Sequence, residues 1–576
     1  MKFHDLVKQE LSDFEEATLD ANQDYVKNQQ SVIELIDLYW SDKFRESQEN
    51  ELGVKKVFYN IIENPSLVAS KMIDIDTKHI RTLAEDDQSY YPAWLFGKEL
   101  HLWMKNTKND EGLTFGQFLN QCVYQLPKYG HILVKKVKDT PVLVPLQNII
   151  NKQDAKNFLD SPYLIEKHTY TPEQFKEIGI EKGWEMVEEV YDKIKKKDTV
   201  DIYERFGKID KYDENYFIFP EDLGEDYILH KSKKNKKDLY KELKWDDVPG
   251  RALGRGQVEK LFEAQIQMNK VVNFKTEGLE WTSKHLWQTR DDGVERNLMQ
   301  RTKNGDVLII NSEVTPVQME ERNLSAYREE EDRLDKLVDR RTFSYDAVRG
   351  ERAPAGTPLG SSMLQAQMAG GFFDLKREDF GMFIKDIIVD WILPSFKNKV
   401  KGKHNILLGE FDENELTQLH NALIIHYTNQ DILKSIVKNG KIPDEKEYQI
   451  LKGITINKIK SQKTLEIPAS YYEDAQYKIQ IDVVGESIDT NNKVNSILYL
   501  VGQIGSNPNI LNDPITRGMI AEVMNLSGLR PTRLDTTTQT QDDIMANVVP
   551  FKPVAGSAPK FTPQAEQSKV SVPLNL

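Results

Sequence analysis

One stretch, from Val248 to Phe396, constrains the fold more than any other part of the 576-residue sequence. It begins with VPGRALGRGQ and continues as two segments whose apolar residues have helical spacing, separated by a short polar insert with one strand-like run, NGDVLIINSE. A loop rich in proline and glycine and a long apolar segment complete it. Because apolar residues at i, i+3, i+4 and i+7 share one face of a helix, the order predicts helix, small insert, helix, loop and helix.

The first two predicted helices are too long to bury all of their surface against each other. A helix of about 27 residues is about 40 Å long. Their predicted apolar lines are Val258, Leu261, Phe262, Gln265, Met268, Val272 and Leu279 in the first, and Tyr327, Leu334, Leu337, Val338, Arg341 and Tyr345 in the second. The mixed charges between Arg328 and Arg340 have two interpretations: a solvated face with i, i+4 ion pairs, or a seam against identical copies of the chain.

The loop between the second and third helices is irregular by composition, because Gly350, Pro354, Gly356, Pro358 and Gly360 interrupt regular structure. Ser361 and Ser362 are predicted to cap the third helix. That helix is predicted to end at Pro394. Its apolar stripe is interpreted as core: Phe380, Phe383, Ile384, Ile387, Ile388, Trp391 and Ile392.

The flanking segments predict a mainly helical start and a region of strands. Residues 1 to about 127 are predicted to be helices, with an apolar helix at Val32–Trp40, an aromatic turn at Asp86–Phe96 and a helix that Pro127 ends. Strands begin at Tyr129 with a hairpin and form a predicted mixed sheet. After the long helix the sequence predicts a strand at HNILLGEF, two helices within residues 412–442, a strand from Tyr477 that returns to the sheet, and helices from Asn492.

The tail from about Thr536 is polar and then rich in proline, serine and alanine, so it cannot bury enough apolar surface to fold alone. It is interpreted either as a loose tail or as an extended arm laid on a neighbouring subunit.

Composition limits the function more than any motif does. The formal net charge of −14 argues against a protein that coats nucleic acid with a basic surface, yet it is compatible with a ring through which DNA slides. The single cysteine, Cys122, excludes an intramolecular disulfide and is predicted to be buried. No transmembrane segment or signal peptide is expected. No nucleotide-binding glycine motif or metal-ligand spacing occurs, so we expect no catalytic residues, no cofactor and no metal site.

The order of these elements resembles the stem, clip, stem, tunnel loop and wing helix of the portal proteins of tailed bacteriophages, in particular those of crAss-like phages. VPGRALGRGQ resembles the entry to the first stem helix, NGDVLIINSE the clip strand and RGERAPAGTPLGSSM the tunnel loop. The resemblance extends from about Gly130 to Leu529. It implies an α+β, mainly helical portal-type fold with these parts: wing at 1–250, stem helix at 251–284, clip at 285–322, stem helix at 323–348, tunnel loop at 349–362, wing at 363–484, crown at 485–535 and tail at 536–576.

The resemblance also implies the function and the partners. About twelve copies would form a ring at one vertex of the capsid, assembled in the host cytoplasm and retained in the virion. Double-stranded DNA would pass through the ring. Terminase and then neck or adaptor proteins would dock on the clip, the major capsid protein would surround the ring, and no membrane would take part. The implied channel residues are Arg349, Glu351, Arg352, Pro354, Gly356 and Gly360, and the implied clip contacts are Arg290, Arg296, Arg301 and Lys303.

Two other classes of function remain open on the sequence alone. One is a different virion ring or adaptor without DNA passage, which would have the same helices but no channel wide enough for a duplex. The other is an acidic cytosolic enzyme with an unrecognised carboxylate site, which would be a monomer or small oligomer with a concave polar pocket. The arginines of the loop 349–362 could either touch phosphates or pair with nearby acids.

Overall fold

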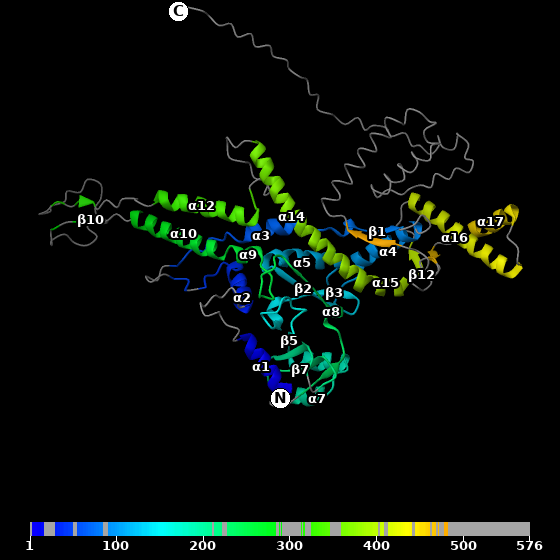
Figure 1. Ribbon diagram of the computed structural model, residues 1–576, viewed down its shortest axis with the longest axis horizontal. Coiled ribbons are helices and arrows are strands. Elements are labelled where there is room, and N and C mark those ends of the chain that lie inside the picture. The colour runs from blue at the N-terminus through cyan, green and yellow to red at the C-terminus, as the bar shows by residue number, and fades with distance from the viewer. Residues whose placement is uncertain are drawn as a thin grey trace, which may run out of the picture. The chain divides into compact units, whose positions relative to one another are not determined.

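The structure, a computed structural model, describes most of the first 481 residues (Figure 1). The chain divides into two compact units, residues 1–485 and 486–576, and every described residue lies in the first unit. The elements are mainly helices with several small sheets, which confirms the predicted mainly helical α+β class. The described residues are 3–15, 29–45, 47–49, 55–84, 90–209, 212–221, 227–283, 287–288, 290, 313, 315–316, 324–345, 359–400, 404–407, 413–439, 444–460, 464–467, 471 and 477–481.

The described N-terminal part is mainly helical, as predicted. Its elements are α1 (Phe3–Glu15), α2 (Gln29–Trp40), α3 (Glu63–Ile73), the 3-10 turn η2 (Thr77–His79), β1 (Ile80–Ala84), α4 (Tyr90–Asn106) and α5 (Phe115–Tyr129). The aromatic turn predicted at Asp86–Phe96 is wrong over its described residues, because Tyr90–Phe96 begins α4. Pro92 lies in the first turn, where its missing amide hydrogen costs no helical bond, and Leu95 and Phe96 are fully buried.

The helix α5 continues past Pro127, which corrects its predicted end. A capping box between Thr114 and Gln117 begins it, and Gly130 ends it in the left-handed conformation with φ of 77°. Pro127 lies in the last turn, so it removes only one late helical bond. Cys122 on this helix is buried, as predicted.

Two antiparallel sheets form the central part. The first has the order β3-β2-β9 and the second the order β4-β5-β6-β7-β8. The predicted β2–β3 hairpin is confirmed, but the predicted mixed sheet is wrong, since all described strand pairs are antiparallel. The strands are β2 (His131–Val137), β3 (Thr140–Val144), β4 (Ile149–Asn151), β5 (Leu164–Tyr170), β6 (Val200–Phe206), β7 (Tyr216–Pro220), β8 (His230–Ser232) and β9 (Tyr240–Lys244). The connecting turns and helices are η3 (Leu146–Asn148), α6 (Pro172–Glu181), α7 (Val187–Ile194) and α8 (Lys236–Leu239).

The long third helix of the central stretch crosses the body as α14 (Leu359–Ile387), and a π turn, η4 (Ile388–Ile392), leads into α15 (Leu393–Val400). Every residue of its predicted core stripe is buried, and the stripe packs with α3, α5, β2 and β3 in one hydrophobic cluster. Pro394 does not end the helix as predicted. The wider π turn just before it accommodates the proline, which cannot bond to the carbonyl four residues earlier. Ser361 and Ser362 lie inside α14 and therefore do not cap it.

The C-terminal described part differs from prediction in two places. Residues 412–442 were expected to form two helices but contain one, α16 (Glu413–Asn439), and α17 (Glu445–Lys460) follows. The strand β14 (Tyr477–Ile481) pairs with β1 and does not join the larger sheets. The predicted strand is present as β12 (His404–Leu407), paired with β13 (Thr464–Ile467). The helices predicted from Asn492 and the tail lie outside the described residues. No described helix is both long and apolar enough to cross a bilayer.

Candidate functional site

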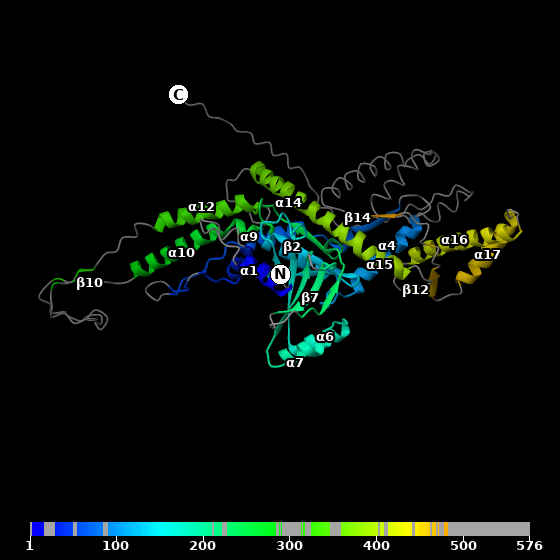
Figure 2. The same ribbon diagram turned by 60° about the horizontal axis from the view of Figure 1, so that its bottom comes forward.

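The most distinctive part of the fold is a two-helix extension, defined here as α10 (Phe262–Ser283), α12 (Leu324–Thr342) and the short strands β10 (Trp287–Gln288) and β11 (Thr315–Pro316). The two helices lie side by side, and β10 lies at their far end (Figures 1 and 2). Lys275 Nζ and Glu331 form an ion pair of 2.5 Å across the helices. The antiparallel pairing of Trp287 with Pro316 closes the insert. The described residues therefore contain the predicted order of helix, insert and helix.

The root of the extension is fixed by a buried ion pair. Arg251, in the VPGRALGRGQ segment, makes a bidentate contact with Glu259 of α9 (Gln257–Lys260), at 2.7 and 2.8 Å. The same guanidinium donates to the carbonyls of Leu253 and Gly254 at 2.9 and 3.0 Å. Both charged side chains are buried. This pairing holds the chain rigidly where it enters the first helix, because the planar guanidinium fixes the orientation of the carboxylate.

A close backbone approach explains the glycines of the same segment. A Cβ on Gly256 would lie 2.6 Å from the amide nitrogen of Gly130 and from the carbonyl oxygen of Pro127. Only glycine permits this approach between the root of the extension and the end of α5. Because the neighbouring atoms belong to the backbone, they cannot move aside as a flexible side chain would.

An extended strap, residues 57–61, runs antiparallel to α10 and is held by amide side chains. Asn273 accepts from the amide of Val57 at 2.8 Å and donates to its carbonyl at 2.9 Å. Asn269 accepts from the amide of Tyr59 at 2.9 Å. Gln265 donates to the carbonyl of Tyr59 at 2.6 Å and accepts from the amide of Ile61 at 3.0 Å.

This amide ladder works because two repeats nearly match. Four residues of helix rise about 6.0 Å, and two residues of extended chain span about 6.6 Å. Amide side chains at every fourth helical position therefore meet the backbone of every second strap residue. The sequence does contain a pattern for this ladder, since its three amide residues recur every fourth position: Gln265, Asn269 and Asn273. The sequence analysis placed only Gln265 on the apolar face and did not predict the strap.

Burial along the extension is uneven. The first half of α10 contributes Phe262, Ala264 and Met268 to the core, and the second half of α12 contributes Leu334 and Val338. In the outer half of α10, by contrast, Phe274 and Leu279 are exposed. The predicted apolar lines are thus confirmed near the body except at Arg341, which is exposed, and the outer end of the first line faces solvent in a single chain.

Most of the predicted site residues lie outside the described part. In the predicted tunnel loop these are Arg349, Glu351, Arg352, Pro354 and Gly356. The last loop residue, Gly360, is the second residue of α14 and so belongs to the helix. In the predicted clip, Arg290 is exposed just after β10, whereas Arg296, Arg301 and Lys303 fall on residues that are not described. These assignments therefore remain predictions.

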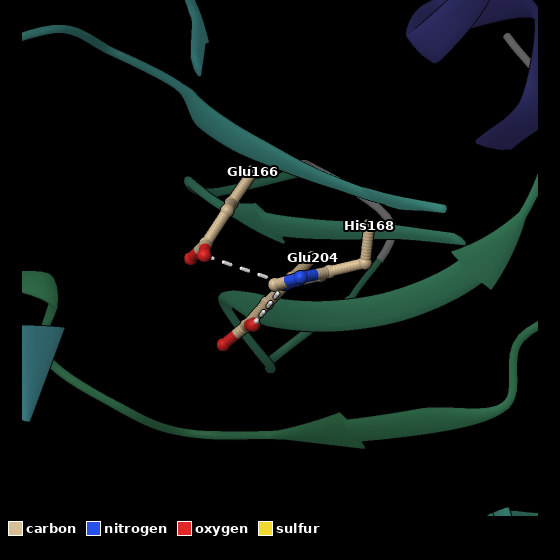
Figure 3. A group of neighbouring side chains, drawn as sticks. All are labelled: Glu166, His168 and Glu204. Carbon is tan, nitrogen blue, oxygen red and sulfur yellow. Dashed lines mark hydrogen bonds and ion pairs between the residues drawn. The ribbon is translucent and has the colours of Figure 1, made fainter. Parts of the chain in front are cut away.

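A second candidate site, which the sequence did not suggest, is a charged cluster between the two central sheets (Figure 3). Glu166 and His168 lie two apart on β5, and so point to one face of the sheet, while Glu204 pairs with Glu166 on the neighbouring strand β6. His168 Nε2 lies 3.3 Å from Glu204 and 3.5 Å from Glu166. Potential ligand atoms of the three residues lie within 4.8 Å of one another, so their residue types and spacing suit a metal ion.

Lys135 from β2 occupies the middle of this cluster. Its ammonium lies 2.7 Å from Glu166 and also contacts Glu204. Burial alone would lower the pKa of Lys135, but the two carboxylates raise it above its usual range. Burial would raise the pKa of Glu204, but the Lys135 ammonium and His168 hold it well below its usual range. The ammonium thus contacts both carboxylates where a metal ion would otherwise bind them.

Two tyrosines complete the cluster. Tyr216 donates to Glu204 at 2.9 Å and Tyr240 donates to Glu166 at 2.5 Å. Burial and the neighbouring carboxylates raise the pKa of both hydroxyls, so each keeps its proton and acts as a donor. The carboxylates therefore have partners on several sides. The arrangement is that of a buried polar network that joins β2 and β9 to β5, β6 and β7.

No protein-family model matches the sequence, and no curated protein matches it.

Proposed function

We propose that this protein is a portal protein, which forms a ring of about twelve copies at one vertex of a bacteriophage capsid and acts as the conduit for DNA. Packaging and ejection would both use this channel. The extension would form the stem and clip, docking terminase first and neck proteins later, and the body would contact the major capsid protein.

The observation that carries the proposal is the outer half of the extension. Phe274 and Leu279 are exposed on α10, and the facing part of α12 is charged on most sides. Exposed apolar side chains on a hairpin that extends beyond the core favour an assembly in which further helices lie beside it. A ring supplies them, because each subunit places its extension against the next one. The resemblance in the order of elements favours a portal among ring-forming proteins.

The charge of the chain supports a conduit over a tight DNA binder. With a formal net charge of −14, the ring surface would make few lasting contacts with phosphates. A DNA duplex that enters during packaging and leaves during ejection requires such weak contacts. The buried carboxylate cluster described above adds little support to the enzyme alternative, because its carboxylates are already bonded to Lys135, Tyr216 and Tyr240.

Two experiments test the proposal. Native mass spectrometry and negative-stain microscopy of the full chain should give a closed ring with an open centre. A stable monomer at high concentration, with or without the capsid protein, contradicts the ring. In phage assembly, deletion of residues 353–356 should reduce the nuclease-protected DNA in particles. Normal DNA content in that mutant contradicts a role for the loop and favours an adaptor without DNA passage.

A further inference from the structure

The imidazole of His131, fully buried at the start of β2, joins the central sheet to the root of the extension. Its Nε2 lies 3.1 Å from a carboxylate oxygen of Glu242 on β9. Its Nδ1 accepts a hydrogen bond of 3.3 Å from the backbone amide of Gly254, in the VPGRALGRGQ segment. The ring also stacks on Phe158, with the ring centroids 4.1 Å apart and the planes 7° from parallel. This one side chain therefore contacts three separate segments of the fold.

The two polar contacts fix which nitrogen of the ring carries the hydrogen. A backbone amide can only donate, so Nδ1 must be the acceptor of the Gly254 bond and carries no hydrogen. An ionised carboxylate can only accept, so Nε2 must donate to Glu242. The same carboxylate also accepts from the amides of Phe158 and Leu159, each at 3.0 Å, and these bonds favour its ionised form. The neutral ring with its hydrogen on Nε2 therefore satisfies both neighbours.

A second proton on the ring would affect the two contacts in opposite ways. The donor on Nε2 remains, and its bond to the Glu242 carboxylate becomes charge-assisted. The new hydrogen on Nδ1 would point at the amide hydrogen of Gly254, so two donors would face each other and this bond would be lost. The imidazolium would also repel the nearby guanidinium of Arg251, which holds the carbonyls of Leu253 and Gly254. Protonation thus keeps the ring on the sheet and releases the root.

The charges around the ring oppose this protonation above mildly acidic pH. Burial lowers the pKa of His131, Glu242 raises it, and Lys244 and Arg251 lower it again, with a net shift below the ordinary value of 6.5. Burial would raise the pKa of Glu242, but the hydrogen bonds from His131, Leu159 and Phe158 lower it. Glu242 therefore stays ionised while His131 stays neutral.

The other elements packed against β2 are β3, α5 and α8. The strand β3 carries no charged side chain, and Lys236 of α8 lies near Glu242. The remaining charged groups of this region already have partners of opposite charge: Lys128 with Asp37, Lys237 with Asp160, and Arg251 with Glu259. Glu242 is thus the carboxylate that draws a proton to this ring.

We propose that His131 is a pH-sensitive joint between the central sheet and the root of the extension: the neutral ring holds the amide of Gly254, and the protonated ring releases it. The contact is fully present above pH 6.5 and is lost as the pH falls through the lowered pKa of His131. Acidification would therefore loosen the segment that leads into α10 while β2 and β9 remain paired. The inference goes beyond the proposed function, because it concerns a single chain and holds whether or not the chain forms a ring.

Hydrogen exchange of the full chain, measured by mass spectrometry in steps from about pH 8 to about pH 4.5, tests the joint. Protection factors are compared, since they remove the intrinsic pH dependence of amide exchange. The peptide that covers residues 250–256 should lose protection about 2- to 10-fold as the pH falls, as expected for the loss of one hydrogen bond. A peptide from the buried part of α14, residues 379–387, is the internal reference and should keep its protection. Unchanged protection at the root, or an equal loss in both peptides, overturns the proposal.

Two matched variants separate the contacts of the ring, because neither new side chain titrates and both remove the stacking on Phe158. The amide of asparagine reaches the position of Nδ1, and that of glutamine reaches the position of Nε2. His131→Asn should keep an acceptor for Gly254 and protect the root equally at every pH. His131→Gln should keep the donor to Glu242 but lose this acceptor, so the root should be less protected at every pH.

Each variant can also contradict the proposal. If the root of His131→Asn loses protection on acidification as the native root does, a group other than His131 responds to the pH. If the two variants protect the root equally at pH 8, the bond from Gly254 to Nδ1 does not hold it. Either result overturns the joint, and neither bears on whether the chain forms a ring.

Discussion

Replacing Lys135 by methionine tests whether the buried charged cluster stabilises the fold as the geometry requires. Methionine retains most of the volume of the side chain but removes the ammonium that contacts Glu166 and Glu204. Two buried carboxylates then face each other without their counter-charge. Removing one partner of a buried ion pair typically costs about 3–5 kcal/mol of unfolding free energy. We expect a loss of this size near pH 8.

The loss should shrink as the pH falls. In the native protein the folded-state pKa of Glu204 is lowered from 4.5 and that of Lys135 is raised from 10.5. The stabilisation is therefore fully present between pH 4.5 and 10.5. It is lost as the pH falls through the lowered pKa of Glu204, and lost as the pH rises through the raised pKa of Lys135. Without the ammonium, burial raises the pKa of Glu204, so the folded variant binds a proton as the pH falls. Its penalty at pH 5 should be clearly smaller than at pH 8.

Hydrogen exchange measured by mass spectrometry on peptides from β5 and β6 gives the local opening free energy, and chemical denaturation gives the global one. The control is the triple variant Lys135→Met, Glu166→Gln, Glu204→Gln, which removes every charge of the ion pair. It should recover most of the lost stability, since replacing a whole buried ion cluster by neutral groups is often nearly neutral. A penalty for Lys135→Met that is below about 1 kcal/mol, or the same at pH 5 and pH 8, would refute the reasoning.

Three further changes probe the extension and its root. Gly256→Ala should destabilise the fold by about 1–3 kcal/mol in chemical denaturation, because the new Cβ meets backbone atoms. The control is Gly278→Ala on α10, where the new Cβ meets nothing within 4 Å, and it should be neutral or stabilising. Equal effects of the two substitutions would contradict the close approach. Asn269→Leu should cost about 1–3 kcal/mol and speed exchange of the Tyr59 amide, its former donor; unchanged exchange would argue against the ladder. Phe274→Glu should leave the stability of the monomer within about 0.5 kcal/mol yet reduce ring formation in native mass spectrometry, and an intact ring would remove the main support for the proposed packing of the stems.

The helical spacing of apolar residues correctly predicted which helix faces are buried in the core. The core stripe of α14 and the inner half of α10 were correct, because a long run of apolar residues at helical spacing has one way to be buried. Proline misled the prediction twice: Pro127 and Pro394 were expected to end helices, yet one lies in a last turn and the other follows a π turn. Both are local backbone adjustments that no pattern of side chains reveals.

The charged cluster and the strap escaped prediction for a different reason. Lys135 lies 31 residues from Glu166 and 69 from Glu204 in the sequence, and only the packing of one sheet on another brings them together. The strap segment 57–61 carries no strand partner and no helical spacing, so its partner on α10, more than 200 residues away, was invisible. The tunnel loop and most of the clip remain predictions from resemblance.

The strap also has a mechanical consequence. Its five hydrogen bonds stand across the axis of α10, so a pull along that axis loads all the rungs at once in shear instead of opening them one after another. Bonds loaded together resist force far better than bonds that unzip singly. The strap is part of the body, and α10 leads to the far end of the extension. An axial pull on the extension would thus reach the body through Gln265, Asn269 and Asn273 as well as through the chain that enters α10.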